Sequence, residues 1–290
     1  GPTLGNEWAA WASALAHRLA QSAIALHCAP EPWPVMGPFH AASLPPSAFD
    51  PDVLAARHGL TREAAMQQVE KLRTAVTARW GTGIMVEFCM RYGNPSTESV
   101  VRQMVAAGCE KILFFPLYPH YAGATSATAN DAFFAALMRE KRQPAARVVP
   151  EYFEHPAYID ALAGSVERAY AGLDHRPDVL VASYHGMPIR YLMQGDPYHC
   201  QCAKTTRLLR ERLGWDKGAI DTTFQSVFGR EEWLKPYTVN HVAELAKAGK
   251  KRIAVMAPAF SADCIETLEE INGEIREAFL HAGGEVFTYI

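Results

Sequence analysis

A histidine and a group of carboxylates each follow an apolar run that is typical of a buried strand. His185 comes directly after the run at residues 179–184, and Glu266 lies in the stretch that follows the run at residues 252–256. In an open α/β sheet, ligands bind at the edge formed by the carboxyl ends of the strands. A neutral imidazole is both a base near pH 7 and a ligand for first-row metals, and a carboxylate accepts protons or binds cations. The two residues therefore indicate proton or cation handling.

Both residues also have a purely structural interpretation. His185 could cap the end of its strand through a backbone hydrogen bond. Asp263 and Glu266, three positions apart, could form a capping box at the start of a helix, in which each side chain accepts a hydrogen bond from the other residue's backbone N–H. The spacing alone leaves these alternatives open.

Short apolar segments alternate with helical periods along most of the chain. We expect strands at residues 84–89, 111–115, 147–151, 179–184, 222–227, 252–256 and 285–290. We expect helices at residues 61–80, 96–107, 126–142, 157–173, 200–213, 239–248 and 264–281. Such alternation predicts an α/β protein with parallel sheets and right-handed crossovers.

The length predicts two lobes, because 290 residues are near the size at which a single core divides. We place the boundary near residues 152–156, so that the first lobe holds residues 1–153 and the second lobe residues 154–290. Each lobe is expected to be Rossmann-like, a parallel sheet flanked by helices, with a cleft between the two.

The N-terminal region has a different pattern. Trp8, Trp11, Leu15 and Leu19 recur at helical spacing, and residues 23–28 are a candidate strand. Residues 29–52 are rich in proline, which predicts an irregular loop.

The composition excludes several classes of protein. With 49% hydrophobic and 20% charged residues the chain is an ordinary globular protein, and a net charge of −3 gives no overall attraction to nucleic acid. No Gly-x-Gly-x-x-Gly pattern follows an expected strand, which argues against a dinucleotide enzyme. No run of 18 apolar residues predicts a membrane span. Six scattered cysteines are typical of a reducing, intracellular compartment.

Six stretches resemble ferrochelatase, the enzyme that inserts ferrous iron into a porphyrin. They occur in the family's order at residues 90–95, 115–128, 183–188, 195–198, 224–233 and 263–268. The resemblance covers about residues 84–290, whereas residues 1–83 diverge and contain no recognisable basic lid loop. It implies two α/β lobes around a cleft and a lyase of haem synthesis that acts on Fe(II) and protoporphyrin IX, or a related porphyrin, with no organic cofactor.

The resemblance also implies roles for individual residues. His185 would be the family's invariant histidine and Glu266 its cleft carboxylate, and both would bind the metal and accept pyrrolic protons. The porphyrin pocket would be lined by aromatic and polar side chains: Arg91, Tyr92, Tyr118, Tyr121, Ser126 and Trp233. Trp233 could equally anchor its loop through burial, and this alternative stays open.

The resemblance suggests two further groups of residues. Asp263, Glu269 and Glu270 would extend a proton relay, or the two glutamates would lie in solvent. Some ferrochelatases hold a [2Fe–2S] cluster through four cysteines, and Cys200, Cys202 and Cys264 are the candidate thiols here, although loose structural thiols are the default. Cys264 stands where the family often has a histidine.

Two other functions compete with the one that the resemblance implies. One is a chelatase of the same fold that inserts another metal into a different tetrapyrrole. The other is a porphyrin- or haem-binding protein with impaired catalysis. In each case the expected partners include a tetrapyrrole, and we expect a cytoplasmic protein that could contact the inner membrane peripherally.

Overall fold

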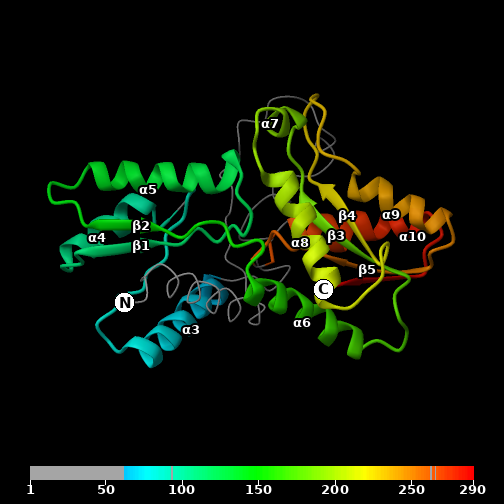
Figure 1. The fold of residues 1–290 in the computed structure, drawn as a ribbon, viewed down its shortest axis with the longest axis horizontal. Helices are drawn as coiled ribbons and strands as arrows, with labels where there is room; N and C mark the ends of the chain where they lie inside the picture. Colours follow the sequence, from blue (N-terminus) through cyan, green and yellow to red (C-terminus); the bar gives the residue numbers. More distant parts are fainter. Residues whose placement is uncertain (1–61, 93, 262, 265) are drawn as a thin grey trace. The chain divides into compact units, whose positions relative to one another are not determined.

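The computed structural model describes residues 62–290 apart from positions 93, 262 and 265 (Figure 1). The helical spacing at Trp8–Leu19, the candidate strand at residues 23–28 and the proline-rich segment 29–52 lie outside the described residues. No helix among the described residues is long and apolar enough to cross a membrane.

The described chain divides into two compact units. One unit contains Tyr118–Gly123 and Glu151–Ile290, and the other contains residues 62–117 and Ala124–Pro150. The chain therefore passes between the units three times, so a single boundary near residue 153 does not separate them. The cleft expected between two lobes stays a prediction.

The first unit is built on a four-stranded sheet in the order β4-β3-β5-β6. Its strands are β3 (Val179–His185), β4 (Ile220–Gln225), β5 (Arg252–Met256) and β6 (Val286–Tyr289). All three pairings are parallel, as the alternating sequence pattern predicts.

Helices connect these strands and cover the sheet. They are α6 (Pro156–Ala171), α7 (Ile189–Met193), α8 (Tyr198–Arg212), α9 (Thr238–Lys247), η4 (Glu266–Ile275) and α10 (Arg276–His281). Helix α6 packs against α8, and α9 packs against α10 and η4. The helix predicted at residues 264–281 is two elements, because Glu266–Ile275 form the π-helix η4 and only Arg276–His281 form an α-helix. The five-residue helix α7 was not predicted.

Alternate residues of β3 face two different helical layers. Val181 joins a buried cluster with Val242 of α9 and Ile271 of η4. Tyr184, whose hydroxyl lies 2.9 Å from Thr206 Oγ1, contacts α8 instead. Burial on both faces is characteristic of a parallel sheet covered by helices, and it explains why this strand, Ser183 apart, is apolar or aromatic until it ends in His185.

The second unit contains a smaller parallel sheet. Strand β1 (Lys111–Phe114) pairs with β2 (Ala145–Val148), and the unit's helices are α3 (Arg62–Trp80), α4 (Thr97–Ala106) and α5 (Thr128–Met138). The π-helix η3 (Gly123–Ala127) leads into α5. Helix α4 begins where Ser96 caps it by accepting a hydrogen bond from Ser99 N at 3.2 Å.

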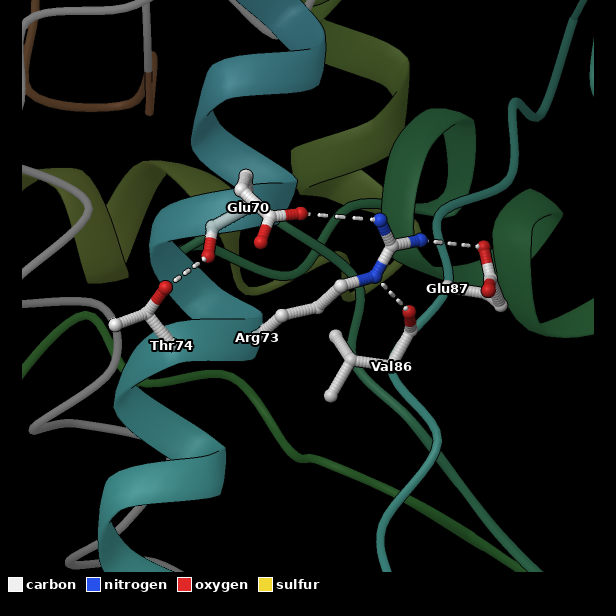
Figure 2. Close-up of polar contacts among 5 residues, drawn as sticks. All are labelled: Glu70, Arg73, Thr74, Val86 and Glu87. Carbon is white, nitrogen blue, oxygen red and sulfur yellow. Dashed lines mark hydrogen bonds and ion pairs between the residues drawn. The ribbon is translucent and has the colours of Figure 1, made fainter. Parts of the chain in front are cut away.

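The strand predicted at residues 84–89 is not formed. This segment is irregular, and the described part of its unit contains only the β1–β2 pair of strands. The carbonyl oxygen of Val86 instead accepts from Arg73 Nε at 2.9 Å, and Arg73 also pairs with Glu87 Oε2 at 2.9 Å (Figure 2). An apolar segment becomes a strand only where a neighbour supplies a hydrogen-bonding ladder, and here a side chain supplies the donor.

Candidate functional site

The carboxyl edge of the four-stranded sheet brings two predicted site residues to one place in the fold. His185 is the last residue of β3 and is paired with Gln225, the last residue of β4. Glu266 begins η4, which follows β5, and its carbonyl oxygen accepts a hydrogen bond from Gln225 Nε2 at 2.7 Å. Gln225 thus links the strand beside His185 to the helix that carries Glu266.

The half-buried imidazole of His185 has a defined tautomer when it is neutral. Its Nδ1 lies 2.7 Å from the carbonyl oxygen of Gly186. A carbonyl oxygen only accepts, so Nδ1 carries the proton and Nε2 keeps its lone pair. The backbone hydrogen bond that we considered as a structural role is therefore present, and it leaves Nε2 available to bind a metal or a proton.

Gly186 permits a close approach behind this histidine. A Cβ atom at this position would lie 2.6 Å from the carbonyl oxygen of Gln225 and 2.9 Å from Cε3 of Trp233, so only glycine fits. The Trp233 side chain is 4% exposed and packs beside Phe228, with ring centroids 4.6 Å apart. This burial is what the anchoring alternative for Trp233 predicts, and its contact with a porphyrin stays a prediction.

The turn that leads into η4 differs from the capping box. Thr267 Oγ1 accepts from the backbone N of Cys264 at 2.9 Å and contacts Asp263 Oδ1 at 3.1 Å. Asp263 also accepts from the hydroxyl of Tyr289 at 2.6 Å. In the described turn, therefore, Thr267 rather than a reciprocal Asp263–Glu266 pair satisfies the backbone.

The Cys264 thiol is buried beside Glu266. Burial, and after it the negative charge of Glu266, raises the pKa of this thiol well above its usual value. Cys264 therefore stays protonated near neutral pH, which makes it a hydrogen-bond donor rather than a thiolate ligand in the absence of metal.

Glu270 does not lie free in solvent. Its Oε1 accepts from the backbone N of Ser226 at 2.5 Å, and its Oε2 accepts from the Ser226 hydroxyl and from Gln225 Nε2 at 3.3 Å. Ser226 has φ +59°, the one positive φ among the described residues other than glycine. Glu270 thus holds a left-handed turn at the end of β4.

The acidic side chains of η4 and of the first turn of α10 are close enough to influence one another. Burial raises the pKa of Glu274, and the charges of Glu270, Glu269 and Glu277 raise it further. Neighbouring carboxylates that disfavour one another's ionisation are suited to sharing protons.

A buried polar network beneath the site escaped sequence reasoning. Ser183 Oγ donates to Gln225 Oε1 at 2.6 Å and lies 2.8 Å from Thr238 Oγ1. The Thr238 hydroxyl contacts Thr223 Oγ1 at 2.8 Å. The available signal was Gln225 itself, a polar residue that lies both in the strand expected at residues 222–227 and in the stretch 224–233 that carries the resemblance.

The remaining predicted residues fall in different places. Tyr118 and Tyr121 belong to the unit that carries His185, whereas Arg91, Tyr92 and Ser126 belong to the other unit. The Arg91 guanidinium lies over the Tyr92 ring, 4.4 Å from its centroid. Ser126 is buried in η3.

The candidate thiols do not converge on one ligand. On α8 the Cys200 side chain is exposed, whereas Cys202 is fully buried in the core. Within the described residues, no group of three or more His, Cys, Asp or Glu side chains is placed to hold a metal ion. A cluster through these cysteines therefore gains no support from the geometry.

Comparison with known proteins places the chain beside one family. The family model described as Ferrochelatase matches residues 61–290, which extends the resemblance N-terminally from residue 84. A ferrochelatase of Rhodobacter capsulatus is 75% identical over 224 residues, which are 77% of this chain and 64% of that protein. One from Allorhizobium ampelinum is 55% identical over 229 residues, 79% of this chain and 66% of that protein. The chain spans slightly less than two thirds of the length of these relatives.

A solved structure shares the fold. SirB from Bacillus subtilis with Fe3+ aligns with a TM-score of 0.52 at 15% identity, over 76% of this chain and 83% of that one. The likeness confirms the predicted α/β class with parallel sheets flanked by helices. Neither competing function, a chelatase for another metal or a binding protein without catalysis, is favoured by these matches.

Proposed function

Because the chain belongs to the ferrochelatase family, we propose that it is a lyase that inserts ferrous iron into protoporphyrin IX or a related porphyrin during haem synthesis. The observation that carries this proposal is the carboxyl edge of the four-stranded sheet. There Nδ1 of His185 lies 2.7 Å from Gly186 O, which leaves Nε2 as the nitrogen that faces the chemistry, and Gln225 connects its strand to the helix that begins at Glu266.

The reaction exchanges two protons for one metal ion. The porphyrin loses its two pyrrolic N–H protons as Fe(II) loses water and binds the four ring nitrogens. His185 Nε2 binds the incoming iron or accepts a proton, and the Glu266 carboxylate accepts a proton beside it. Asp263, Glu269 and Glu270 are the candidates to pass protons on from Glu266.

The porphyrin is the second substrate. Its flat apolar ring suits aromatic side chains, and its propionates suit hydroxyl and guanidinium groups. We assign these contacts to Tyr118, Tyr121, Ser126, Arg91 and Tyr92. Trp233, whose ring lies against Gly186, supports the turn after His185, and its contact with the porphyrin is also part of the proposal.

A cytoplasmic location with peripheral contact to the inner membrane is part of the proposal. The peripheral contact is supported by two exposed apolar side chains in the segments that follow β3 and β4, Met193 at 79% and Phe228 at 62% exposure. An exposed Arg190 side chain, paired with Glu231 at 2.7 Å, lies on the same helix as Met193.

A direct assay tests the proposal. Protoporphyrin is added to the chain under anaerobic conditions with Fe(II), and insertion is followed through the Soret and Q bands. Catalysed insertion above the rate without protein is expected. Porphyrin binding without insertion would favour the binding-protein alternative, and selective insertion of cobalt or nickel into another tetrapyrrole would favour the other chelatase.

A further inference from the structure

The segment Tyr118–Gly123 is anchored to a unit other than the one that its flanking residues belong to. Residues 62–117 and Ala124–Pro150 form one unit, but this segment packs with Glu151–Ile290. The segment also carries two of the side chains proposed to contact the porphyrin, Tyr118 and Tyr121. Its conformation must therefore be set by contacts that are distant in sequence.

Four hydrogen bonds hold the segment from residue 119 to residue 123. Pro119 O accepts from Tyr152 N at 3.0 Å, and His120 Nε2 lies 2.8 Å from Thr205 Oγ1. Tyr121 N donates to Gln201 Oε1 at 2.7 Å, and Gly123 N donates to Asp196 Oδ2 at 2.7 Å. Two side chains on or just before α8, Gln201 and Asp196, thus accept from the backbone of the segment.

Asp196 is suited to this role by its two oxygens. While Oδ2 accepts from Gly123 N, Oδ1 accepts from Tyr198 N at 3.0 Å in the first turn of α8. Its own backbone N donates to Tyr191 O at 2.9 Å, which fixes the residue against α7. A carboxylate accepts on both oxygens, whereas an amide offers one oxygen and one NH₂ donor. Only an aspartate can make both contacts at this length of side chain.

We propose that Asp196, assisted by Gln201, is a positioning residue that fixes the backbone of Tyr118–Gly123 and so presents Tyr118 and Tyr121 to the porphyrin. The inference rests on the proposed function for the identity of the ligand. It explains why residues 195–198 and 115–128, two motifs far apart in the chain, occur together: one supplies the acceptor and the other the donor.

The test compares Asp196→Asn with Asp178→Asn. Asp178 also accepts from two backbone N–H groups, those of Lys251 at 2.8 Å and Arg252 at 2.9 Å, but both bind its Oδ2. An asparagine can therefore keep both bonds at position 178 and only one at position 196. Gln201→Met, which removes the acceptor for Tyr121 N at similar volume, is a second variant.

Three measurements are made on each variant. Asp196→Asn should speed amide hydrogen exchange at Gly123 or Tyr198 and weaken protoporphyrin binding about tenfold, the effect of losing one hydrogen bond to a charged group. The KM for porphyrin should rise by a similar factor while kcat changes less than about twofold. Gln201→Met should speed exchange at Tyr121 and also weaken porphyrin binding, and Asp178→Asn should change neither quantity.

The outcomes separate the anchoring from the proposed function. Wild-type exchange and wild-type porphyrin affinity in both Asp196→Asn and Gln201→Met would overturn the inference. Faster exchange with unchanged porphyrin affinity would overturn the link from anchor to ligand. If the wild-type chain itself binds no porphyrin, the proposed function fails, and the exchange data still decide whether Asp196 holds the segment.

Discussion

His185 combines a fixed ring with a free nitrogen. The contact from Nδ1 to Gly186 O, at 2.7 Å, orients the imidazole and directs the lone pair of Nε2 away from the backbone. Because this bond is made to the adjacent residue, its loss should have little effect on folding. No other residue of β3 has a side-chain nitrogen that could replace Nε2 of His185 in binding a metal or a proton.

We therefore expect His185→Ala to reduce metal insertion by at least about 100-fold, the usual contribution of a positioned acid or base. Porphyrin affinity and the melting temperature should stay near wild type. Zn(II) or Fe(II) insertion followed by the Soret and Q bands gives the rate, and His281→Ala, an exposed histidine of α10, is the control. Near wild-type turnover in a folded variant would remove His185 from the proposed mechanism.

Glu266 offers a second test, because its structural and chemical roles predict different results. In Glu266→Gln the carbonyl oxygen that accepts from Gln225 Nε2 is a backbone atom and remains. The amide side chain cannot accept a proton, so turnover should fall by about 10- to 100-fold. The free energy of unfolding should change by less than about 1 kcal/mol. A large loss of stability with an unchanged rate would instead assign Glu266 to the turn.

At the scale of elements, the turn after β4 is tied to η4. Ser226 has φ +59°, a conformation that costs a residue with a Cβ about 1 to 2 kcal/mol. Glu270 offsets this cost by accepting from both the backbone N and the hydroxyl of Ser226. The turn and the π-helix are therefore expected to lose stability together.

Two substitutions at one position separate the strain from the hydrogen bond. Ser226→Ala and Ser226→Gly both lose the hydroxyl, but glycine accepts a positive φ at little cost. The Ser226→Gly variant should therefore be more stable than the Ser226→Ala variant by about 1 kcal/mol. Combining Ser226→Ala with Glu270→Gln should reveal a coupling of about 1 kcal/mol in the free energy of unfolding. Chemical denaturation measures both. If Glu270 relays protons instead, Glu270→Gln will lower turnover with little loss of stability.

Most elements could be predicted from the sequence, and the failures have physical causes. The strand at residues 179–184 is apolar because both of its faces are covered, so its composition alone identified it. The strand predicted at residues 84–89 failed because an apolar composition does not reveal whether a partner strand is present. The π-helix η4 was read as part of an α-helix, since a change from i→i+4 to i→i+5 hydrogen bonds leaves no clear mark on the residue pattern.

At the scale of the whole molecule, the order of residues along the chain does not predict roles that depend on contacts distant in sequence. His185 and Glu266 were predicted because strand ends of a parallel sheet meet at one edge whatever their separation in sequence. Gln225, Ser226 and Thr267 were missed because their roles depend on hydrogen-bond partners that only the folded chain supplies. Tyr118–Gly123 was assigned to the first lobe for the same reason, since its acceptors on the C-terminal side of the chain cannot be inferred from spacing.

The global stability of the molecule should depend on pH through His120. This side chain is 2% exposed and lies among the rings of Phe153, Tyr158, Tyr184 and Tyr198. Burial lowers its pKa from 6.5 to about 3. The unfolded chain therefore binds a proton at this residue as the pH falls below 6.5, whereas the folded chain does so only near pH 3. The contribution of neutral His120 to the free energy of unfolding is complete above pH 6.5 and is lost progressively between pH 6.5 and pH 3.

This linkage gives a measurable difference between two proteins. From pH 7.5 to pH 5, His120 alone should lower the free energy of unfolding by about 2 kcal/mol, because one proton costs about 1.4 kcal/mol per pH unit. In His120→Gln the amide can still donate to Thr205 Oγ1, which lies 2.8 Å from the histidine Nε2 and itself donates to Phe153 O. That variant should be less stable than the wild type at pH 7.5. Between pH 7.5 and pH 5, however, its free energy of unfolding should fall by about 2 kcal/mol less than that of the wild type. Urea unfolding of both proteins at several pH values isolates the contribution of His120, since all other titrating groups are shared. Parallel pH profiles would show that the folded protein admits a proton to this residue near its ordinary pKa, and that the aromatic cluster around it is open to water.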